Sequence, residues 1–355
     1  MTAQESLFYW FQNQKRDLPF RQNKVAYRIW VSEVMLQQTR VSAMLPLYNR
    51  FISKFPDVAT LAKASEDEVL ASWSGLGYYS RARNLRKAAI FLMSQYNGAF
   101  PKTLEEALQI PGIGPYTARA VLSIAYDKPY AVLDGNVKRV LSRLFLYESN
   151  ILGPKADREL QALADDFLNV THPGDHNQAM MELGATICLP QNPKCLLCPL
   201  RTICKASETE KTALIPIRES KKEKHILKGR ILWMECSGEV LLIKTDGFRF
   251  LKGMYRLPML FDSPYPTKEY EPDGLSLFLA EQMKGQVSRA SIRHSITHHA
   301  MQLDLFFRNF TSKEREHLDA SIGSDKEFLW VKMESLETYF PSSLARKTKK
   351  ALESS

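Results

Sequence analysis

Four of the chain's five cysteines lie within 17 of its 355 residues, and this cluster constrains the fold more than any other feature. They are Cys188, Cys195, Cys198 and Cys204, separated by six, two and five residues. The chain has neither a signal-like apolar stretch nor an uncharged run that could span a bilayer, so we expect a cytoplasmic protein whose thiols stay reduced. Four thiolates this close suit either one tetrahedral zinc ion or an iron–sulfur cluster. Zinc sites usually have two Cys-x-x-Cys pairs, and the single pair here favours the cluster.

The charge balance indicates the partner, and the length indicates two domains. The sequence has 48 Lys and Arg against 39 Asp and Glu, a net charge of +9, which favours a polyanion such as nucleic acid. At about 100–200 residues per domain, 355 residues predict two domains.

A segment between the two halves has the composition of a linker. Residues 209–228 carry Pro216 and six basic residues with little apolar periodicity. We therefore expect a linker there, between domains of residues 1–208 and 229–355.

The two halves differ in their apolar pattern. Before the linker, apolar residues recur every three or four positions in residues 85–91, 118–125 and 137–145, as in amphipathic helices. After it, short apolar runs are separated by turn-forming pairs at residues 237–238 and 246–247, which is typical of strands. The fifth cysteine, Cys236, ends such a run and is predicted to lie in the core. An all-α domain is therefore expected to precede an α/β domain.

A glycine-containing hairpin joins two helical segments within residues 108–125. Its sequence, residues 110–118, is IPGIGPYTA. Gly112 and Gly114 allow the backbone to approach a surface, and Pro115 suits the first turn of a helix whose free amides favour a phosphate. This pattern predicts a helix–hairpin–helix that clamps a DNA backbone, although an ordinary turn between two helices has the same glycines.

Two carboxyl groups lie in contrasting surroundings. Asp134 comes directly before a striped helix, where an N-cap carboxylate is expected to stay ionised. Glu33 lies in a helix-like segment, residues 27–39, beside Ile29, Trp30 and Leu36, and these apolar neighbours should raise its pKa. Taken singly, each residue also fits a plain cap or a helix-surface glutamate. Together they supply the acid and the anion that expel a leaving group from a sugar through an oxocarbenium-like state.

Several motifs together carry a family resemblance. They are residues 30–39 (WVSEVMLQQT), residues 75–81 (GLGYYSR), the hairpin, residues 133–137 (LDGNV) and the four-cysteine spacing. This set resembles the MutY-type adenine DNA glycosylases of the helix–hairpin–helix base-excision superfamily, over nearly the whole chain and most strongly over residues 18–204. The resemblance implies removal of adenine mispaired with 8-oxoguanine or guanine in double-stranded DNA. It also implies a 4Fe–4S cluster on Cys188, Cys195, Cys198 and Cys204, and a nudix-like domain over residues 229–355 that inspects the damaged guanine.

The resemblance assigns roles to residues where the motifs match. Glu33 is then the acid that protonates the imidazole ring of the purine, and Asp134 stabilises the sugar cation. Tyr116 and Asn136 support these two carboxyls. We expect a monofunctional enzyme that acts as a monomer on the DNA of the nucleoid.

Further residues of the same motifs are expected to bind the DNA. The target base must leave the helix to be reached, so a side chain has to fill the gap. Gln38 and Tyr78 match the family residues that insert beside the unpaired base, and Thr39 and Leu76 lie in the same motifs. Arg16 and Arg21 match positions that line the adenine pocket, although either could contact only a phosphate.

Two other functions are compatible with parts of this pattern. An endonuclease III-like pyrimidine glycosylase and lyase also has the cluster and the clamp, but it needs a lysine where this chain has Tyr116, because a phenol cannot form a Schiff base. A non-catalytic damage sensor would not need both Glu33 and Asp134.

The second half lacks the clustered glutamates of nudix hydrolases, so it is expected to bind rather than hydrolyse. Residues 294–298 (HSITH) resemble the family's lesion-reading loop, with Thr297 and His298 toward the lesion. Ile296 departs from the usual aromatic residue, and a polar strand end with stray histidines is the alternative.

Overall fold

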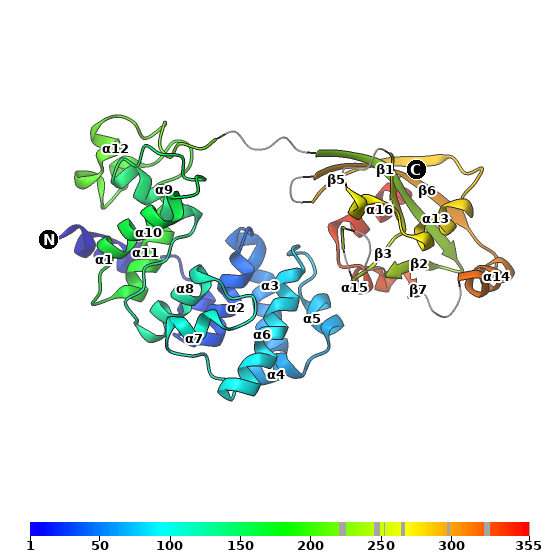
Figure 1. Cartoon of the computed structure of the whole chain (residues 1–355), viewed down its shortest axis with the longest axis horizontal. Coiled ribbons are helices and arrows are strands. Elements are labelled where there is room, and N and C mark those ends of the chain that lie inside the picture. Colours follow the sequence, from blue (N-terminus) through cyan, green and yellow to red (C-terminus); the bar gives the residue numbers. More distant parts are fainter. Residues whose placement is uncertain are drawn as a thin grey trace. The chain divides into compact units, whose positions relative to one another are not determined.

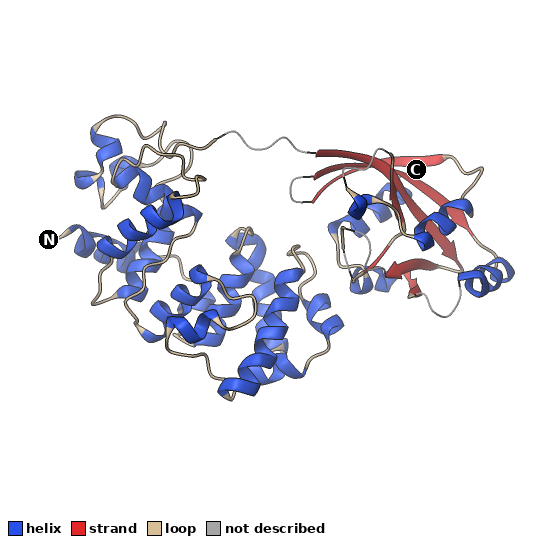
Figure 2. Cartoon of the chain, in the orientation of Figure 1, coloured by secondary structure: helices blue, strands red, loops and turns tan. Residues whose placement is uncertain are grey.

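The computed structural model describes residues 1–219, 225–244, 249–251, 253–263, 267–296, 299–322 and 327–354. The chain divides into two compact units, Met1–Val69 with Tyr78–Ser220, and Leu70–Gly77 with Lys221–Ser355. Within the described residues, Figure 2 shows helices and loops before residue 220 and every strand after it. This confirms the predicted order of a helical domain followed by an α/β domain.

Helices make up nearly all regular structure in residues 1–219, and several begin at capping side chains. Thr2, Asp57, Thr103 and Asp134 each accept a hydrogen bond from a backbone amide of the first turn. The elements, labelled in Figure 1 where there is room, are α1 (Ala3–Gln14), η1 (Pro19–Arg21), α2 (Ala26–Leu36), α3 (Val41–Lys54), α4 (Val58–Lys63), α5 (Glu66–Ser72), α6 (Ser80–Tyr96), α7 (Leu104–Leu108), α8 (Pro115–Tyr126), α9 (Gly135–Leu144), α10 (Ala156–Phe167), α11 (Pro173–Thr186), η2 (Cys195–Leu197), η3 (Arg201–Ile203) and α12 (Lys205–Glu208).

Helix α2 is the buried centre of the first unit. Eight of its residues are buried, and it packs against α3, α6 and α8. A helix that is apolar on most sides is stable only in such a place. The sequence predicted a helix-like segment over residues 27–39, but α2 ends at Leu36, because Gln38 takes a left-handed conformation (φ +57°) that interrupts it.

The predicted helix–hairpin–helix is present as α7, a glycine-containing turn and α8. Gly112 has φ +79°, and a Cβ there would lie 2.6 Å from Asn84 Cβ, so only glycine fits. Ile113 is buried and anchors the turn, while Gly112 and Gly114 are exposed on either side of it. Pro115 is the first residue of α8, as the sequence predicted.

The described residues of the second unit form a seven-stranded sheet in the order β3-β2-β1-β6-β5, with β4 paired to β1 and β7 to β2. Strands β1 and β6 pair in parallel, with Ile231 opposite Leu305, and the other pairs are antiparallel. The elements are β1 (His225–Cys236), β2 (Glu239–Lys244), β3 (Tyr255–Arg256), β4 (Met259–Phe261), η4 (Lys268–Tyr270), α13 (Gly274–Glu281), β5 (Ser288–Ile296), β6 (His299–Asn309), α14 (Ser312–Ile322), β7 (Phe328–Lys332), η5 (Met333–Ser335), α15 (Leu336–Tyr339) and α16 (Ser343–Glu353).

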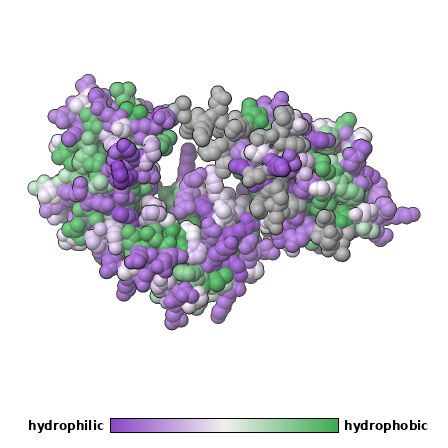
Figure 3. Space-filling view, viewed as in Figure 1, coloured by the Kyte–Doolittle hydropathy of each residue, from purple (hydrophilic) through white to green (hydrophobic). Residues whose placement is uncertain are grey.

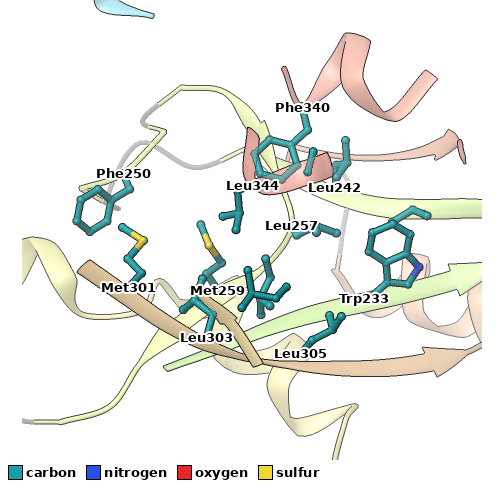
Figure 4. Packing of buried hydrophobic residues seen from close by; sticks show 14 of the residues in the cluster. Trp233, Leu242, Phe250, Leu257, Met259, Met301, Leu303, Leu305, Phe340 and Leu344 are labelled. Carbon is teal, nitrogen blue, oxygen red and sulfur yellow. The ribbon is translucent and has the colours of Figure 1, made fainter. Parts of the chain in front are cut away.

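Both faces of this sheet are covered. Successive residues of β1 alternate between two cores: Trp233 packs with Leu344 of α16, whereas Met234 and Cys236 pack with Leu279 of α13. Figure 4 shows the first core, where side chains of β1, β2, β4 and β6 meet those that follow α15 and begin α16. The burial of Cys236 confirms that it is a core residue.

The stretch expected as a linker, residues 209–228, is partly structured. Ile215 is buried, the Ile217 carbonyl accepts a hydrogen bond from the Ile151 amide, and Lys211 pairs with Glu148. Strand β1 begins at His225, inside the expected linker. The turn expected at residues 246–247 lies outside the described residues.

The visible surface in Figure 3 is largely hydrophilic, with scattered hydrophobic patches. Among the described residues, no helix has the length and apolar character needed to cross a bilayer.

Candidate active site

One cavity of about 1160 Å³ in the first unit brings together residues from five helices and the loops beside them. Of the residues predicted from the sequence, those lining it are Arg16, Arg21, Glu33, Gln38, Thr39, Tyr116, Asp134 and Asn136. Segments about 100 residues apart in the sequence therefore meet at one site, which is large enough for a nucleoside.

Glu33 is a buried acid that holds a proton near neutral pH. Its side chain projects from α2, and the residue is 5% exposed. The Tyr116 hydroxyl of α8 donates a 2.5 Å hydrogen bond to Glu33 Oε2. The pKa of Glu33 is raised to about 7: burial is the main cause, the Tyr116 hydrogen bond and Arg21 oppose the rise, and the nearby Asp134 adds to it. The expected pKa rise is confirmed, and a group with this pKa can donate a proton at physiological pH.

Asp134 caps α9 as predicted. Its Oδ1 accepts from the Val137 amide at 2.7 Å, and its Oδ2 accepts from Asn136 Nδ2 at 3.1 Å. The sequence predicted that this position alone would favour ionisation. Instead, burial raises the pKa of Asp134 above its ordinary value, and the hydrogen bonds with Val137 and Asn136 offset only part of that rise. Both carboxyls of the site are thus destabilised as anions.

A second buried glutamate in the cavity was not identified from the sequence. The side chain of Glu182, in α11, has no exposed area and forms ion pairs with Arg16 (2.6 Å) and Arg21 (2.8 Å). Burial raises the pKa of Glu182, but the two arginines outweigh burial and lower the pKa below its ordinary value. The available signal was an acid within the apolar helical run of residues 179–185, the same signal that identified Glu33.

Of the other predicted DNA-binding residues, Leu76, Tyr78, Gly112 and Gly114 are not part of the cavity lining. Tyr78 is 41% exposed with φ +49° and is therefore not a core residue; Gln38, at the cavity, is also exposed. Leu76 is buried, within the segment Leu70–Gly77 that groups with the second unit.

Two arginines on α9 join Asn136 to the cysteine loop. Arg139 Nη2 donates to Asn136 Oδ1 (2.9 Å), and its Nε donates to the Cys188 carbonyl (2.8 Å). One turn later, Arg143 Nη1 donates to Cys188 Sγ (3.3 Å). Neither arginine was singled out from the sequence, because buried basic residues on a striped helix resemble ordinary surface charges.

The four clustered cysteines surround one small cavity, beside Arg143. Among the residues the structure describes, no group of His, Cys, Asp and Glu is arranged to hold a single metal ion. The ligands of an iron–sulfur cluster bind different irons, so four thiolates around one cavity suit such a group. The Arg143 guanidinium beside Cys188 Sγ is compatible with the negative charge of a thiolate-bound centre.

The expected lesion-reading residues Thr297 and His298 lie outside the described residues. Three residues before Thr297 in the sequence, His294 of β5 is buried, and burial, with Lys347 nearby, lowers its pKa to about 4. His294 is therefore neutral at physiological pH.

Comparisons with known proteins agree with this geometry. Residues 31–165 match the model of the "HhH-GPD superfamily base excision DNA repair protein" family. The adenine DNA glycosylase of Buchnera aphidicola subsp. Baizongia pistaciae is 37% identical over 258 residues, covering 72% of this chain and 72% of that protein. The adenine DNA glycosylase of Homo sapiens is 42% identical over 212 residues, covering 57% of this chain and 39% of that protein.

A solved structure of a thermostable thymine-DNA glycosylase aligns with a TM-score of 0.53 at 27% identity, covering 58% of this chain and 95% of that chain. Fold and cavity together define a helix–hairpin–helix base-excision DNA repair protein. Within that class, the chain belongs to the adenine DNA glycosylase family.

Proposed function

We propose that this protein is a DNA glycosylase of base excision repair that hydrolyses the N-glycosidic bond of adenine, and that its substrate is adenine mispaired with 8-oxoguanine or guanine. The observation that carries the proposal is an acid with a pKa raised to about 7, Glu33, beside a second buried carboxyl, Asp134, in one nucleoside-sized cavity. The relatives named above are adenine DNA glycosylases, and the motifs in the sequence resemble the MutY type.

Glu33 acts as the general acid. When the extruded adenosine enters the cavity, the Glu33 proton passes to the imidazole ring of the purine. The bond between the sugar C1′ and the base nitrogen then breaks, its electron pair stays with the base, and adenine leaves neutral. Proton transfer from a positioned acid typically contributes about 10²–10⁴-fold to a rate.

Asp134 stabilises the sugar cation that remains. Its carboxylate is held by the Val137 amide and by Asn136, so it needs little reorganisation when positive charge develops at C1′. Water then adds to C1′ and gives a proton to the Glu33 carboxylate, which restores the acid and leaves an abasic site. Burial makes the Asp134 anion costly in the empty site and strengthens its attraction to the cation.

Glu182, Arg16 and Arg21 form the base-recognition side of the cavity. Adenine offers an amino-group donor and ring-nitrogen acceptors. Ionised Glu182 can accept from the amino group, and Arg21, which is mostly buried, can donate to a ring nitrogen. Guanine and thymine carry a carbonyl oxygen where adenine has its amino group, so an ionised Glu182 favours adenine over these two bases.

Strand cleavage through a Schiff base is not part of this activity. The residues described as lining the cavity include no lysine, and the position where such a lysine is expected holds Tyr116, bonded to Glu33. We therefore propose a monofunctional glycosylase rather than an endonuclease III-like lyase.

Cys188, Cys195, Cys198 and Cys204 would hold a 4Fe–4S cluster, which when bound supplies structural order and charge rather than a step of base release. Lys194 and Arg201 flank these cysteines and are exposed, where they can contact DNA phosphates. The second unit, a mixed sheet covered on both faces by helices, is proposed to be a nudix-like module that reads the lesion through Thr297 and His298. We further propose that the protein acts as a monomer on double-stranded DNA of the nucleoid.

Purified protein incubated with duplexes carrying adenine opposite 8-oxoguanine, guanine or thymine tests the function directly. We expect free adenine and alkali-labile sites from the first two duplexes and little from the third. The Glu33→Gln variant serves as the matched control. Release of pyrimidines instead, or strand breaks without alkali, would contradict the proposal.

A further inference from the structure

Arg81 holds the end of helix α2 from a different part of the chain. It lies in the first turn of α6 and is buried, at 9% exposed. Its Nη1 donates to the carbonyl oxygens of Val34 (2.8 Å), Met35 (3.0 Å) and Gln37 (2.5 Å), and its Nη2 donates to Thr39 Oγ1 (3.3 Å). The last carbonyls of a helix have no partner within it, and a cation there is favourable. One guanidinium thus satisfies the carbonyls where α2 ends, three residues beyond Glu33.

The same guanidinium contacts the turn that carries Tyr78. The Cζ atom of Arg81 lies 5.5 Å from the centroid of the Tyr78 ring. Tyr78 (φ +49°) and Gln38 (φ +57°) both adopt the left-handed conformation, and both are exposed. Such conformations cost of order 1–3 kcal/mol each and persist only where surrounding contacts impose them. Two strained, exposed segments from distant parts of the sequence therefore share one buried cation.

We propose that Arg81 is a positioning residue: it fixes the segment of Gln38 and the turn of Tyr78 as one rigid edge beside the cavity, and couples that edge to the helix that carries Glu33. This inference rests on the proposed function, in which the edge holds DNA from which a nucleotide has been extruded. Because strained segments cannot keep their shape alone, a rigid edge needs an internal support. Arg81 touches no reacting atom and acts through the segments that it holds.

A lysine cannot replace Arg81 in this role. The planar guanidinium reaches three carbonyls and one hydroxyl and also lies against an aromatic ring, whereas an ammonium is a single compact charge with three donors. Burial lowers the pKa of Arg81 to about 10, so the guanidinium remains charged at pH 7. Arg81→Lys therefore keeps the charge and removes the geometry.

The expected defect lies in base extrusion rather than in proton transfer. A small misplacement of a positioning element costs about 10- to 100-fold in rate. We expect Arg81→Lys to slow single-turnover adenine release by that factor, and to reduce equally the fluorescence rise of a duplex with 2-aminopurine at the target position. The pH at which the rate falls, set by Glu33, should stay unchanged.

Arg86→Lys is the matched control. Arg86 is on the same helix, and its Nε donates to the Ala64 carbonyl (2.6 Å) at the end of α4, away from the cavity lining. The Arg86→Lys substitution therefore removes a guanidinium hydrogen bond at the end of a helix without affecting the segments of Gln38 and Tyr78. The control should release adenine and extrude 2-aminopurine like the unchanged protein.

A double-variant cycle separates positioning from simple loss of folded protein. Rates are measured per active site, so a purely structural role would lower the active fraction and leave the rate unchanged. The effects of Tyr78→Leu and Arg81→Lys on the rate should be strongly non-additive.

If Arg81→Lys does not fold, Thr39→Val replaces it, because it removes one acceptor of the guanidinium and keeps side-chain volume. Additive effects, or Arg81→Lys within twofold of the unchanged protein, would overturn the inference. If the unchanged protein extrudes 2-aminopurine but releases no adenine, the proposed function fails and the extrusion assay still decides the role of Arg81.

Discussion

Two buried glutamates line the same cavity, and their surroundings give them opposite protonation behaviour. Glu33 on α2 faces a phenol, Tyr116, and burial raises its pKa to about 7. Glu182 on α11 faces two guanidiniums, and its pKa is lowered although burial alone would raise it. Burial therefore does not assign a role by itself. The side chain that contacts a buried acid determines whether the acid is protonated or ionised near pH 7.

The largest expected effect follows from removing the stored proton. Glu33→Gln keeps the shape of the side chain but has no proton to give, so we expect single-turnover adenine release to fall by at least about 10²-fold, up to 10⁴-fold. Binding to the mispaired duplex should change little. A variant that releases adenine at near the normal rate would show that Glu33 is not the acid.

Removing the negative charge of Glu182 should reduce the stability of the folded protein. Glu182→Gln leaves Arg16 and Arg21 without their anion, and breaking a buried ion pair from one side costs about 3 kcal/mol of unfolding free energy. Because the folded-state pKa of Glu182 is lowered, this contribution is present above the unfolded-state pKa and is lost as the pH falls through the folded-state pKa.

Urea unfolding at several pH values measures this effect, with Glu148→Gln as control. Glu148 forms an exposed pair with Lys211 and should matter little. An equal loss of unfolding free energy in Glu182→Gln and Glu148→Gln would contradict the role given to the buried Glu182 ion pairs.

Glu33 should show the opposite dependence on pH. Its raised folded-state pKa means that stability is full below the unfolded-state pKa of about 4.5 and is lost as the pH rises through about 7. At 1.36 kcal/mol per pH unit, the loss is about 3 kcal/mol, which Glu33→Gln avoids. The variant should therefore gain stability relative to the unchanged protein between pH 5 and pH 8. A constant difference across this range would mean that Glu33 titrates normally.

The smallest effect concerns the phenol. The Tyr116 hydroxyl favours the ionised form of Glu33, so Tyr116→Phe should raise the pKa of Glu33 further and move the alkaline fall of the adenine-release rate up by about one pH unit. Tyr126→Phe is the control on the same helix, since that hydroxyl donates to the Phe100 carbonyl instead. A shift to lower pH would contradict the assigned hydrogen bond.

Local signals in the sequence were sufficient for much of this site. Apolar neighbours indicated the raised pKa of Glu33, the residue order indicated the Asp134 cap, and the glycines indicated the hairpin. Features that depend on contacts between distant segments were not accessible. Helix α2 ends before the left-handed Gln38, and the carbonyls there are bound by Arg81, more than 40 residues away in the sequence, so the helix was predicted three residues too long.

The dependence on contacts between distant segments also explains why Glu182 was missed and why the pKa of Asp134 was predicted wrongly. Glu182 has its partners more than 160 residues away, so its sequence neighbourhood looks like any apolar helix. For Asp134, the cap was correctly predicted, but the burial that raises its pKa comes from packing of the assembled cavity. Chain topology, rather than local pattern, determines both.

The most direct test of the contrast is a titration of the two glutamate carboxyls. Protein labelled with carboxyl-¹³C glutamate is followed by NMR from pH 4 to pH 9, and the Glu33→Gln and Glu182→Gln spectra assign the two signals. We expect the Glu33 signal to titrate with a midpoint near 7 and the Glu182 signal to show no titration midpoint above 4.5. A Glu33 midpoint near 4.5, or a Glu182 midpoint near 7, would contradict the assignment of Glu33 as the proton donor and Glu182 as the ionised partner of the arginines.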